Sequence, residues 1–494
     1  MPRRLIERIT GRPRPVTTSL SRRQILQAGM ATAATLLSAR PAPSCGEKHN
    51  AGRRRVIVVG AGFSGLACAY ELASAGYDVK VFEARNRVGG RVSSLKDLIP
   101  GMNVEAGGEL LGANHPHVLA YAAKFGFDFL DVAEEDGSSP VILNGRKLSD
   151  DEVEKISVEV NSAYSAMTED ARPVNSDEPW NTPDARALDL RTTAAWIQGL
   201  KLSDVARSLL TLQLTANNGV ETERQSYLGN LTQVKGGGLD KYWSDTEVYR
   251  LKGGNQQFAL RFAAKLGTDR LMLDCPIREI ETTDHKICVV DVRNRRHEAD
   301  DLVLAIPPST WSTIRFTPDL PKELTPQMGA NVKYLSVVRN PFWRESGLSP
   351  DGKTDGDIGL TWHGTDGQTD DGPCALVAFS GGPAARKIHN RVAEAKQPAS
   401  LKAFEQLFPG FGAQFVKGQF VDWIEDPWSR GGYSFPAPGQ ITTLGPTLRQ
   451  GLGHLHFSGE HTCYQFVGYM EGALHSGASL AKRIADRDGL TRQS

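Results

Sequence analysis

The stretch that decides the fold is VIVVGAGFSG, residues 56–65. Its first four residues are β-branched and apolar, which is typical of a buried parallel strand, and residues 66–75 predict a helix. Between them, Gly60 permits a tight turn, Gly62 lets backbone N–H groups approach a pyrophosphate, and Gly65 lets the helix and strand lie close together. The N-terminus of the helix adds partial positive charge. The stretch therefore predicts a strand–turn–helix unit that binds a dinucleotide.

A second predicted strand, residues 78–82, leads directly to Glu83, whose carboxylate is placed to accept hydrogen bonds from the adenosine ribose. The next eight residues read ARNRVGGR. Gly89 and Gly90 allow close approach of the backbone, and Arg91 can neutralise a phosphate. A nicotinamide enzyme does not need this second glycine–arginine segment, whereas a flavin nucleotide extends further across the sheet edge. The arrangement therefore predicts a flavin nucleotide.

The signature at residues 83–91, an acid followed by AR-x-R-x-GGR, resembles that of the flavin amine oxidase family. This family includes monoamine, polyamine and L-amino-acid oxidases, and the resemblance covers about residues 53–487. It implies an α/β fold in which a Rossmann-like FAD-binding lobe, of the p-hydroxybenzoate-hydroxylase type, is interleaved with an α+β substrate-binding lobe. A chain of 494 residues is long enough for two such lobes.

The two expected domains alternate along the chain. The FAD-binding domain would comprise residues 53–132, 246–308 and 420–487, and the substrate-binding domain residues 133–245 and 309–419. The segment 351–372 is rich in Asp and Gly and therefore predicts a surface loop.

Later segments resemble family motifs that contact FAD. The EAGG segment at residues 105–108 would pass beside the flavin, and Ile277 would touch the adenine. Glu460 would bind the ribityl and phosphate region, and the helix that opens near Met470 would direct its positive dipole at the flavin pyrimidine. The motif and the resemblance together assign to non-covalent FAD the residues Gly60, Gly62, Ser64, Gly65, Glu83, Ala84, Arg85, Gly89, Gly90, Arg91, Gly107, Gly108, Ile277, Gly459, Glu460 and Met470.

Lys333 is a single charge in an apolar, strand-like run at residues 331–337. In the family, a lysine on this strand is hydrogen-bonded through water to flavin N5, and Lys333 is the matching residue. The resemblance implies that it organises this water and promotes reoxidation by oxygen. The alternative is an outward-facing lysine on an edge strand.

Three aromatic residues are the other catalytic candidates. Tyr433 and Tyr469 fall on the two family positions that sandwich the substrate amine, and Trp423 matches the tryptophan that precedes the first of them. Two parallel rings present negative faces that favour an amine nitrogen. The alternative is that each tyrosine is a core or rim residue.

Two departures from the family pattern bear on cofactor and substrate. Monoamine oxidases carry a flavin-linked cysteine just before the first of these two tyrosines. Here the residue before Tyr433 is Gly432, so we expect non-covalent FAD. Some L-amino-acid oxidases place a carboxylate-binding arginine after the Gly-Gly segment. Here Leu110 stands there, preceded by Glu109, which favours an amine without a carboxylate. Arg224, Arg339 and Arg430 remain possible substitutes for that arginine.

The sequence thus predicts an FAD-dependent amine oxidase. Hydride transfer from the C–N unit of a small amine would give an imine and then an aldehyde or ketone, with H2O2 if oxygen is the acceptor. The alternatives are an L-amino-acid oxidase and a non-catalytic FAD-binding protein. Residues 56–494 contain 45 basic and 55 acidic residues, so we expect no nucleic-acid partner. The cysteines show no metal-ligand spacing. A homodimer is a possible assembly.

The first residues are expected to be an export signal. Paired arginines, Arg22 and Arg23, precede a modestly apolar, Ala-rich stretch, which is the layout of a twin-arginine signal peptide. Residues 1–52 would then be signal and linker, and the protein would be periplasmic or secreted. Lipidation of Cys45 stays open, as does the cleavage site. No apolar run is long enough for a transmembrane helix.

Overall fold

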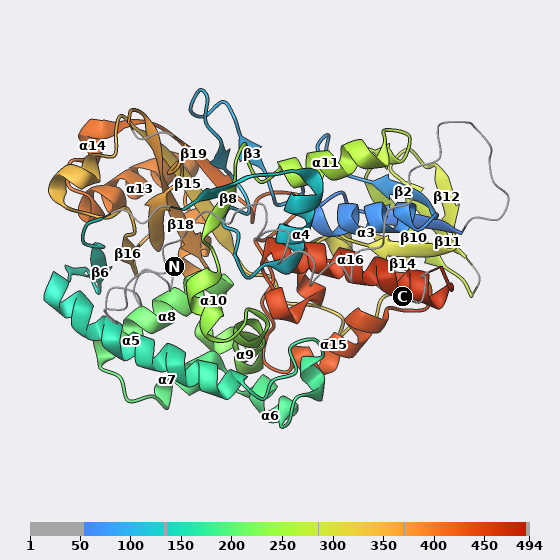
Figure 1. Cartoon of the computed structure of the whole chain (residues 1–494), viewed down its shortest axis with the longest axis horizontal. Helices are drawn as coiled ribbons and strands as arrows, with labels where there is room; N and C mark the ends of the chain where they lie inside the picture. Colours follow the sequence, from blue (N-terminus) through green and yellow to red (C-terminus); the bar gives the residue numbers. More distant parts are fainter. Residues whose placement is uncertain (1–53, 133–135, 285, 369–370, 491–494) are drawn as a thin grey trace.

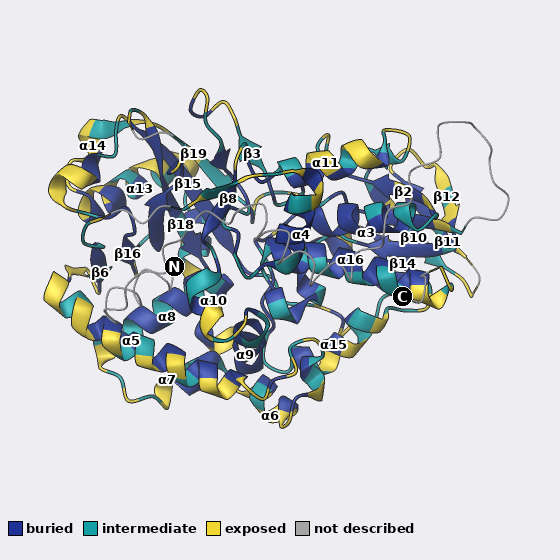
Figure 2. Ribbon diagram, viewed as in Figure 1, coloured by how far each residue is buried: buried dark blue, intermediate teal, exposed yellow. Residues whose placement is uncertain are grey.

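The computed structural model describes residues 54–132, 136–284, 286–368 and 371–490. Two lobes lie side by side, and each is built from segments that are distant in the chain (Figure 1). In Figure 2 the buried residues line the interior of both lobes, and exposed residues follow the outer faces of the peripheral helices.

One lobe is organised by a five-stranded sheet in the order β20-β13-β1-β2-β9. Every neighbouring pair in this sheet is parallel. The strands are β1 (Arg55–Val59), β2 (Asp78–Phe82), β9 (Leu271–Met272), β13 (Asp301–Leu304) and β20 (Leu455–Phe457). The apolar run that predicted a buried parallel strand is β1, at the centre of the sheet, and β2 has the bounds that the sequence predicted.

Helices cover one face of this sheet, and a smaller sheet covers the other. The helices are α3 (Phe63–Ser74), α4 (Pro116–Phe125), α11 (Gln257–Leu266) and α16 (Met470–Arg487). Helix α16 approaches α3 closely because Gly477 has no side chain to meet the Ser64 carbonyl oxygen. The smaller sheet has the order β12-β11-β10-β14, with β10 (Ile277–Thr282), β11 (Ile287–Asp291), β12 (Arg296–Ala299) and β14 (Arg315–Thr317).

The second lobe contains a seven-stranded sheet in the order β19-β15-β18-β17-β16-β6-β7. Its strands are β6 (Val141–Leu143), β7 (Arg146–Lys147), β15 (Asn331–Val338), β16 (Lys353–Thr354), β17 (Leu360–His363), β18 (Cys374–Gly381) and β19 (Phe415–Asp422). The helices of this lobe are α5 (Asp150–Ala171), α6 (Ala185–Leu190), α7 (Thr193–Gln198), α8 (Asp204–Asn218), α9 (Tyr227–Gly236), α10 (Asp240–Asp245), α12 (Pro383–His389), α13 (Ala393–Leu407) and α14 (Phe411–Gln414). Strand β15 is buried along its whole length, between β19 and β18.

Three sequence expectations need correction. The predicted surface loop at 351–372 is wrong, because this segment contains β16 and β17, and residues 351–354 and 358–366 are buried. The expected domain boundary at residue 308 also falls too early, since β14 pairs in parallel with β10 and so extends the FAD-side sheet beyond it. The boundary at 420 cuts through β19, which belongs to the seven-stranded sheet up to Asp422.

The expected signal peptide and linker, residues 1–52, lie outside the described residues. Within the described part of the chain, none of the helices combines the length and apolar character needed to cross a membrane.

Candidate active site

A long pocket runs between the two lobes, beginning at the carboxyl ends of β1 and β2. Residues that follow β13 and β20 also line it, which is the usual place for a ligand in a parallel sheet. Its far end lies against the second lobe. The pocket brings together the sequence candidates Gly60, Gly62, Ser64, Glu83, Ala84, Arg85, Gly89, Gly90, Arg91, Gly107, Gly108, Ile277, Lys333, Trp423, Tyr433, Gly459, Glu460, Tyr469 and Met470.

The glycines of the first turn are needed because they leave room for neighbouring atoms. A side chain on Gly65, which lies behind the pocket wall, would collide with the Gly60 carbonyl oxygen, so glycine is required where α3 meets β1. Gly62 has no atom within 4 Å of the position that a Cβ would take, so this edge of the turn is open to a ligand. The Glu83 carboxylate accepts hydrogen bonds from Ala61 N and Arg85 N, both at 2.8 Å, which fixes it at the end of β2.

Arg91 and Glu460 form one polar unit in the pocket wall. Arg91 Nη1 donates to the Gly432 carbonyl at 2.6 Å and to Glu460 Oε1 at 2.9 Å. The Glu460 carboxylate also accepts bonds from Ser434 N, Ser434 Oγ and Gly468 N. Burial raises the pKa of Glu460, but Arg91, His461 and the Ser434 hydrogen bond together outweigh it and hold the pKa below its usual value. Glu460 therefore binds the protein's own donors, whereas the resemblance implied direct contact with the ribityl and phosphate region.

The buried His461 side chain indicates whether the pocket wall offers polar atoms to a ligand such as FAD. It lies in the pocket wall, and neither ring nitrogen has a hydrogen-bond partner. Burial lowers its pKa to about 4, so the ring is neutral and offers one donor and one acceptor. Buried polar atoms are rarely left unpaired. Together with the open edge at Gly62, this orphaned ring fits a ligand that brings polar atoms, such as the phosphates and ribityl hydroxyls of FAD.

Lys333 lies inside the protein, with a side chain only 6% exposed. Its Nζ donates to the Glu109 carboxylate at 2.7 Å, to Gly107 O at 2.9 Å and to Glu105 O at 3.1 Å. The alternative of an outward-facing lysine on an edge strand is therefore wrong, because β15 is an interior strand. Protein acceptors use all three N–H groups of the ammonium, whereas the resemblance implied a water-mediated bond to flavin N5.

Tyr433 and Tyr469, the two tyrosines expected to form a cage around the substrate amine, line the same pocket. Tyr433 donates its hydroxyl hydrogen to Ala216 O at 3.1 Å, and the Tyr469 hydroxyl lies 3.4 Å from that of Tyr242. Gly468, just before Tyr469, leaves room for the Tyr433 ring, since a Cβ there would lie 3.1 Å from Tyr433 Cδ2. Burial raises the pKa of both phenols, so both rings are neutral.

Trp423 is held between the two lobes. Its indole Nε1 donates to the Ala106 carbonyl at 3.2 Å, immediately before the Gly-Gly segment. It lines the pocket, as do Leu360, Trp362 and Phe379 from the second lobe. The substrate end of the pocket is therefore mostly aromatic and aliphatic, as in most small-molecule sites.

Gly432 is glycine for a reason that the sequence did not show. A Cβ at this position would overlap the side chain of Asn331, at the start of β15. A cysteine at position 432 would thus require Asn331 to move. Among the described residues that line the pocket, Cys275 is the only cysteine. It lies beside Ile277, at the end expected to hold the adenine. This arrangement agrees with non-covalent FAD.

The pocket walls contain three cationic side chains among the described residues, and a carboxylate neutralises each one. Arg85 pairs with Asp426 at 2.5 Å, Arg91 with Glu460, and Lys333 with Glu109. The arginines that remained possible carboxylate ligands, Arg224, Arg339 and Arg430, do not line the pocket. The acid Glu247 also lines the pocket and helps to raise the pKa of both Tyr433 and Tyr469.

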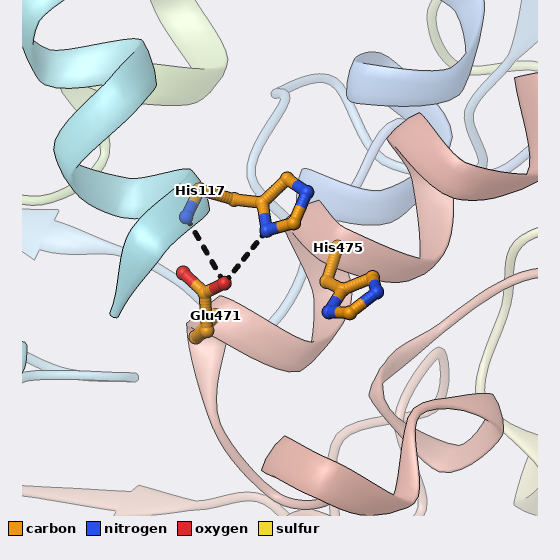
Figure 3. Close-up of side chains that lie close together, drawn as sticks. All are labelled: His117, Glu471 and His475. Atoms are coloured by element: carbon orange, nitrogen blue, oxygen red, sulfur yellow. Dashed lines mark hydrogen bonds and ion pairs between the residues drawn. The ribbon is translucent and has the colours of Figure 1, made fainter. Parts of the chain in front are cut away.

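A histidine–glutamate cluster of His117, Glu471 and His475 lies where α16 begins, directly after Tyr469 in the chain (Figure 3). Glu471 accepts bonds from His117 Nδ1 at 2.8 Å and from the backbone N–H groups of His117 and Val118. The rings of His117 and His475 stack at 4.5 Å with only 25° between their planes. A metal lies near the plane of each coordinating ring, so joint coordination by these stacked rings would require them to turn. The cluster instead anchors the N-terminus of α4 to α16.

The sequence interpretation missed the side chains that support Lys333. They are Glu109, Arg250, Asn255, Trp362 and Asp366. The one available signal was an acid in the apolar stretch after the Gly-Gly segment, and it did not identify the partners.

Comparisons with known proteins agree with this site. Residues 63–485 match the family model described as flavin containing amine oxidoreductase, and residues 25–99 match the pyridine nucleotide-disulphide oxidoreductase model. The chain is 28% identical to flavin-containing amine oxidase B of Homo sapiens, over 87% of this chain and 85% of that protein.

Two solved structures are similar over nearly the whole described chain. A cyclohexylamine oxidase from Brevibacterium oxydans has a TM-score of 0.80 at 28% identity, covering 88% of this chain and all of that one. A putrescine oxidase bound to putrescine has a TM-score of 0.79 at 27% identity, covering 88% and 99% of the two chains. The chain thus belongs to the flavin-containing amine oxidoreductase family, as an FAD-dependent enzyme that oxidises the CH–NH group of amines.

Proposed function

We propose that the substrate is a small amine without a carboxylate group and that oxygen is the electron acceptor. The observation that carries this proposal is the pairing of every cation in the described pocket wall. Arg85, Arg91 and Lys333 each have a carboxylate partner, and the cage is bordered by the acid Glu247. An amino-acid carboxylate would therefore meet no uncompensated positive charge in this wall. This disfavours the alternative of an L-amino-acid oxidase.

The residues of the chain bind and orient the amine. When bound, FAD accepts the hydride from the carbon next to the amine nitrogen. The faces of Tyr433 and Tyr469 hold the nitrogen between them, and the apolar wall around Trp423 excludes water. The nitrogen loses a proton, and water then hydrolyses the imine to an aldehyde or ketone and ammonia or a smaller amine.

Lys333 serves the second half of the reaction. Its ammonium, fixed against the Gly107 carbonyl, lies beside the segment expected to pass the flavin. The family resemblance assigns to this lysine the promotion of reoxidation, in which oxygen takes two electrons and two protons to form H2O2. The alternative of a non-catalytic FAD-binding protein would need neither the cage nor this lysine.

Anaerobic reduction of the purified holoenzyme tests the proposal. We expect cyclohexylamine, putrescine or a related amine to bleach the oxidised flavin band, and L-amino acids to leave it unchanged. Readmitted air should restore the band and release H2O2. Bleaching by L-amino acids alone would transfer the assignment to the L-amino-acid oxidase, and bleaching by neither group would favour the non-catalytic protein.

We also propose export of the folded holoenzyme by the twin-arginine route to the periplasm or medium. The paired Arg22 and Arg23 before an Ala-rich stretch support this proposal. Replacing both arginines with lysine should retain the protein in the cytoplasm, as measured by fractionation. A homodimer stays a prediction, which sedimentation of the holoenzyme would check.

A further inference from the structure

The ammonium of Lys333 is held by a network from three strands and one connecting segment. Lys333 extends from β15, Arg250 belongs to β8 (Tyr249–Leu251), and Trp362 belongs to β17. Glu109 follows β4 (Val104–Glu105) and lies at the centre. The side chains of Lys333, Glu109 and Arg250 are 6%, 4% and 3% exposed, so all three are removed from solvent.

The two carboxylate oxygens of Glu109 bind different partners. Oε2 accepts the 2.7 Å bond from Lys333 Nζ. Oε1 accepts bonds from Arg250 Nε at 2.9 Å and Trp362 Nε1 at 2.8 Å. Burial raises the pKa of Glu109, but Lys333 and Arg250 outweigh it and hold the pKa below its usual value. The carboxylate is therefore charged, and each oxygen is fixed by a cation.

Each partner of Glu109 is fixed in turn. Arg250 also pairs with Asp366 and donates to His363 O at 2.8 Å. Asn255 Nδ2 donates to the Glu109 carbonyl at 2.6 Å, which secures the backbone next to the Gly-Gly segment. Two acids and two bases balance in this network, as buried charges require. The position of the ammonium thus depends on contacts outside β15.

We propose that Glu109 is the positioning residue of Lys333: it fixes the ammonium against the Gly107 and Glu105 carbonyls, where it promotes reoxidation. The proposal rests on the role of Lys333 in the proposed function. Glu109 would act on reoxidation through Lys333, not through its own contact with a reactant. Without the carboxylate, two buried cations lose their common partner, and the lysine side chain would leave its present position.

A double-mutant cycle tests this dependence. The variants are Lys333→Met, Glu109→Gln and the double variant, each studied as holoenzyme by anaerobic reduction with an amine and by mixing the reduced enzyme with oxygen. We expect both single variants to slow reoxidation by about tenfold or more, with the double variant no slower than Lys333→Met, because residues that act as a unit are not additive. The reduction rate should change less than the reoxidation rate.

Glu71→Gln is the matched control, because Glu71 is a fully buried acid on α3 that also pairs with a lysine, Lys124, outside the pocket. It should leave both rates unchanged. A second readout is the visible absorption spectrum of the bound oxidised flavin, in which Glu109→Gln should reproduce the change caused by Lys333→Met.

Distinct outcomes would overturn the two ideas. If the two losses multiply in the double variant, or if Glu109→Gln slows reduction and reoxidation equally, Glu109 is not a positioning residue for Lys333. If Lys333→Met reoxidises at the original rate, the proposed role of Lys333 fails, and the Glu109 inference is then decided by whether the two spectra agree. If Glu109→Gln does not fold, Glu109→Asp replaces it; unchanged reoxidation in that variant would overturn the inference.

Discussion

The two ends of the pocket are built in different ways. At the nucleotide end, the backbone determines the site: Gly60, Gly62 and Gly65 shape one turn, and Glu83 closes the next strand within the same βαβ unit. At the flavin and substrate end, side chains from distant elements determine it, as where Lys333 meets Glu109 and Arg250. The first end follows from spacing along the chain, whereas the second depends on the tertiary fold. This difference predicts which substitutions will abolish FAD binding and which will alter only the chemistry.

The largest effect should come from the nucleotide turn. Gly65→Ala places a methyl group against the Gly60 carbonyl oxygen and forces α3 away from β1, so we expect loss of soluble, FAD-containing protein. Gly62→Ala meets no protein atom within 4 Å, so this variant should fold and yet bind FAD at least about tenfold more weakly. Circular dichroism and FAD titration of the apoprotein separate the two results. Equal FAD affinity in wild type and Gly62→Ala would show that no ligand approaches this edge.

The cage should have the next largest effect and should leave the cofactor in place. Tyr433→Ala and Tyr469→Ala remove the aromatic faces, and we expect kcat/KM for an amine to fall by about 10- to 100-fold, on the scale of a lost cation–π contact or misplaced substrate. The flavin content should stay that of the wild type. Steady-state kinetics with absorbance-based FAD quantitation checks both points. A large loss of FAD in either variant would mean that the tyrosines support the cofactor and not the amine.

The same difference explains what could be predicted from the sequence. Strands β1 and β2 and the helix α3 were predictable, because their signals lie within about thirty residues of one βαβ unit. Lys333 was predictable as a candidate only by resemblance, and its partners were not, because Glu109 and Arg250 are 141 residues apart in sequence and Arg250 and Asp366 are 116 apart. Without the fold, no spacing rule joins them.

The failed loop prediction has a related cause. The Asp and Gly content of residues 351–372 suggested turns, but β17 pairs with β18 and is buried on both sides within the seven-stranded sheet. Thr361 shows how tertiary contacts decide the matter: its hydroxyl accepts a bond from Gly352 N and donates to Pro350 O inside the lobe. Strand propensity depends on such surroundings more than on composition.

Gly432 lines the pocket just before Tyr433 and accepts a hydrogen bond from Arg91, and its replacement should have a moderate effect. Gly432→Cys would make the new side chain overlap Asn331, so we expect a loss of about 1–3 kcal/mol of unfolding free energy and no covalent flavin. Combining it with Asn331→Ala should recover most of that stability. Denaturant unfolding, with acid precipitation to detect protein-bound flavin, checks the pair. A stable, covalently flavinylated single variant would show that Asn331 does not control this position.

The smallest effect concerns stability at acid pH. It tests whether the cluster of His117, Glu471 and His475 is purely structural. Burial lowers the pKa of His475 to about 4. Burial raises the pKa of Glu471, but His117, His115 and the Val118 N–H together outweigh it and lower the pKa to about 2. In both cases the folded state binds fewer protons than the unfolded state, so stability is complete above the unfolded pKa values and falls as the pH drops below them.

For His475 this loss should occur between about pH 6.5 and 4, with an upper limit of about 1.4 kcal/mol per pH unit. The variant His475→Asn should therefore lose less stability than the wild type between pH 7 and 4, as measured by urea unfolding. Amine turnover at neutral pH should be unchanged, because His475 does not line the pocket. An unaltered pH dependence would show that His475 takes up its proton in the folded state, and a change in turnover would show that the anchor of α16 also influences the cage.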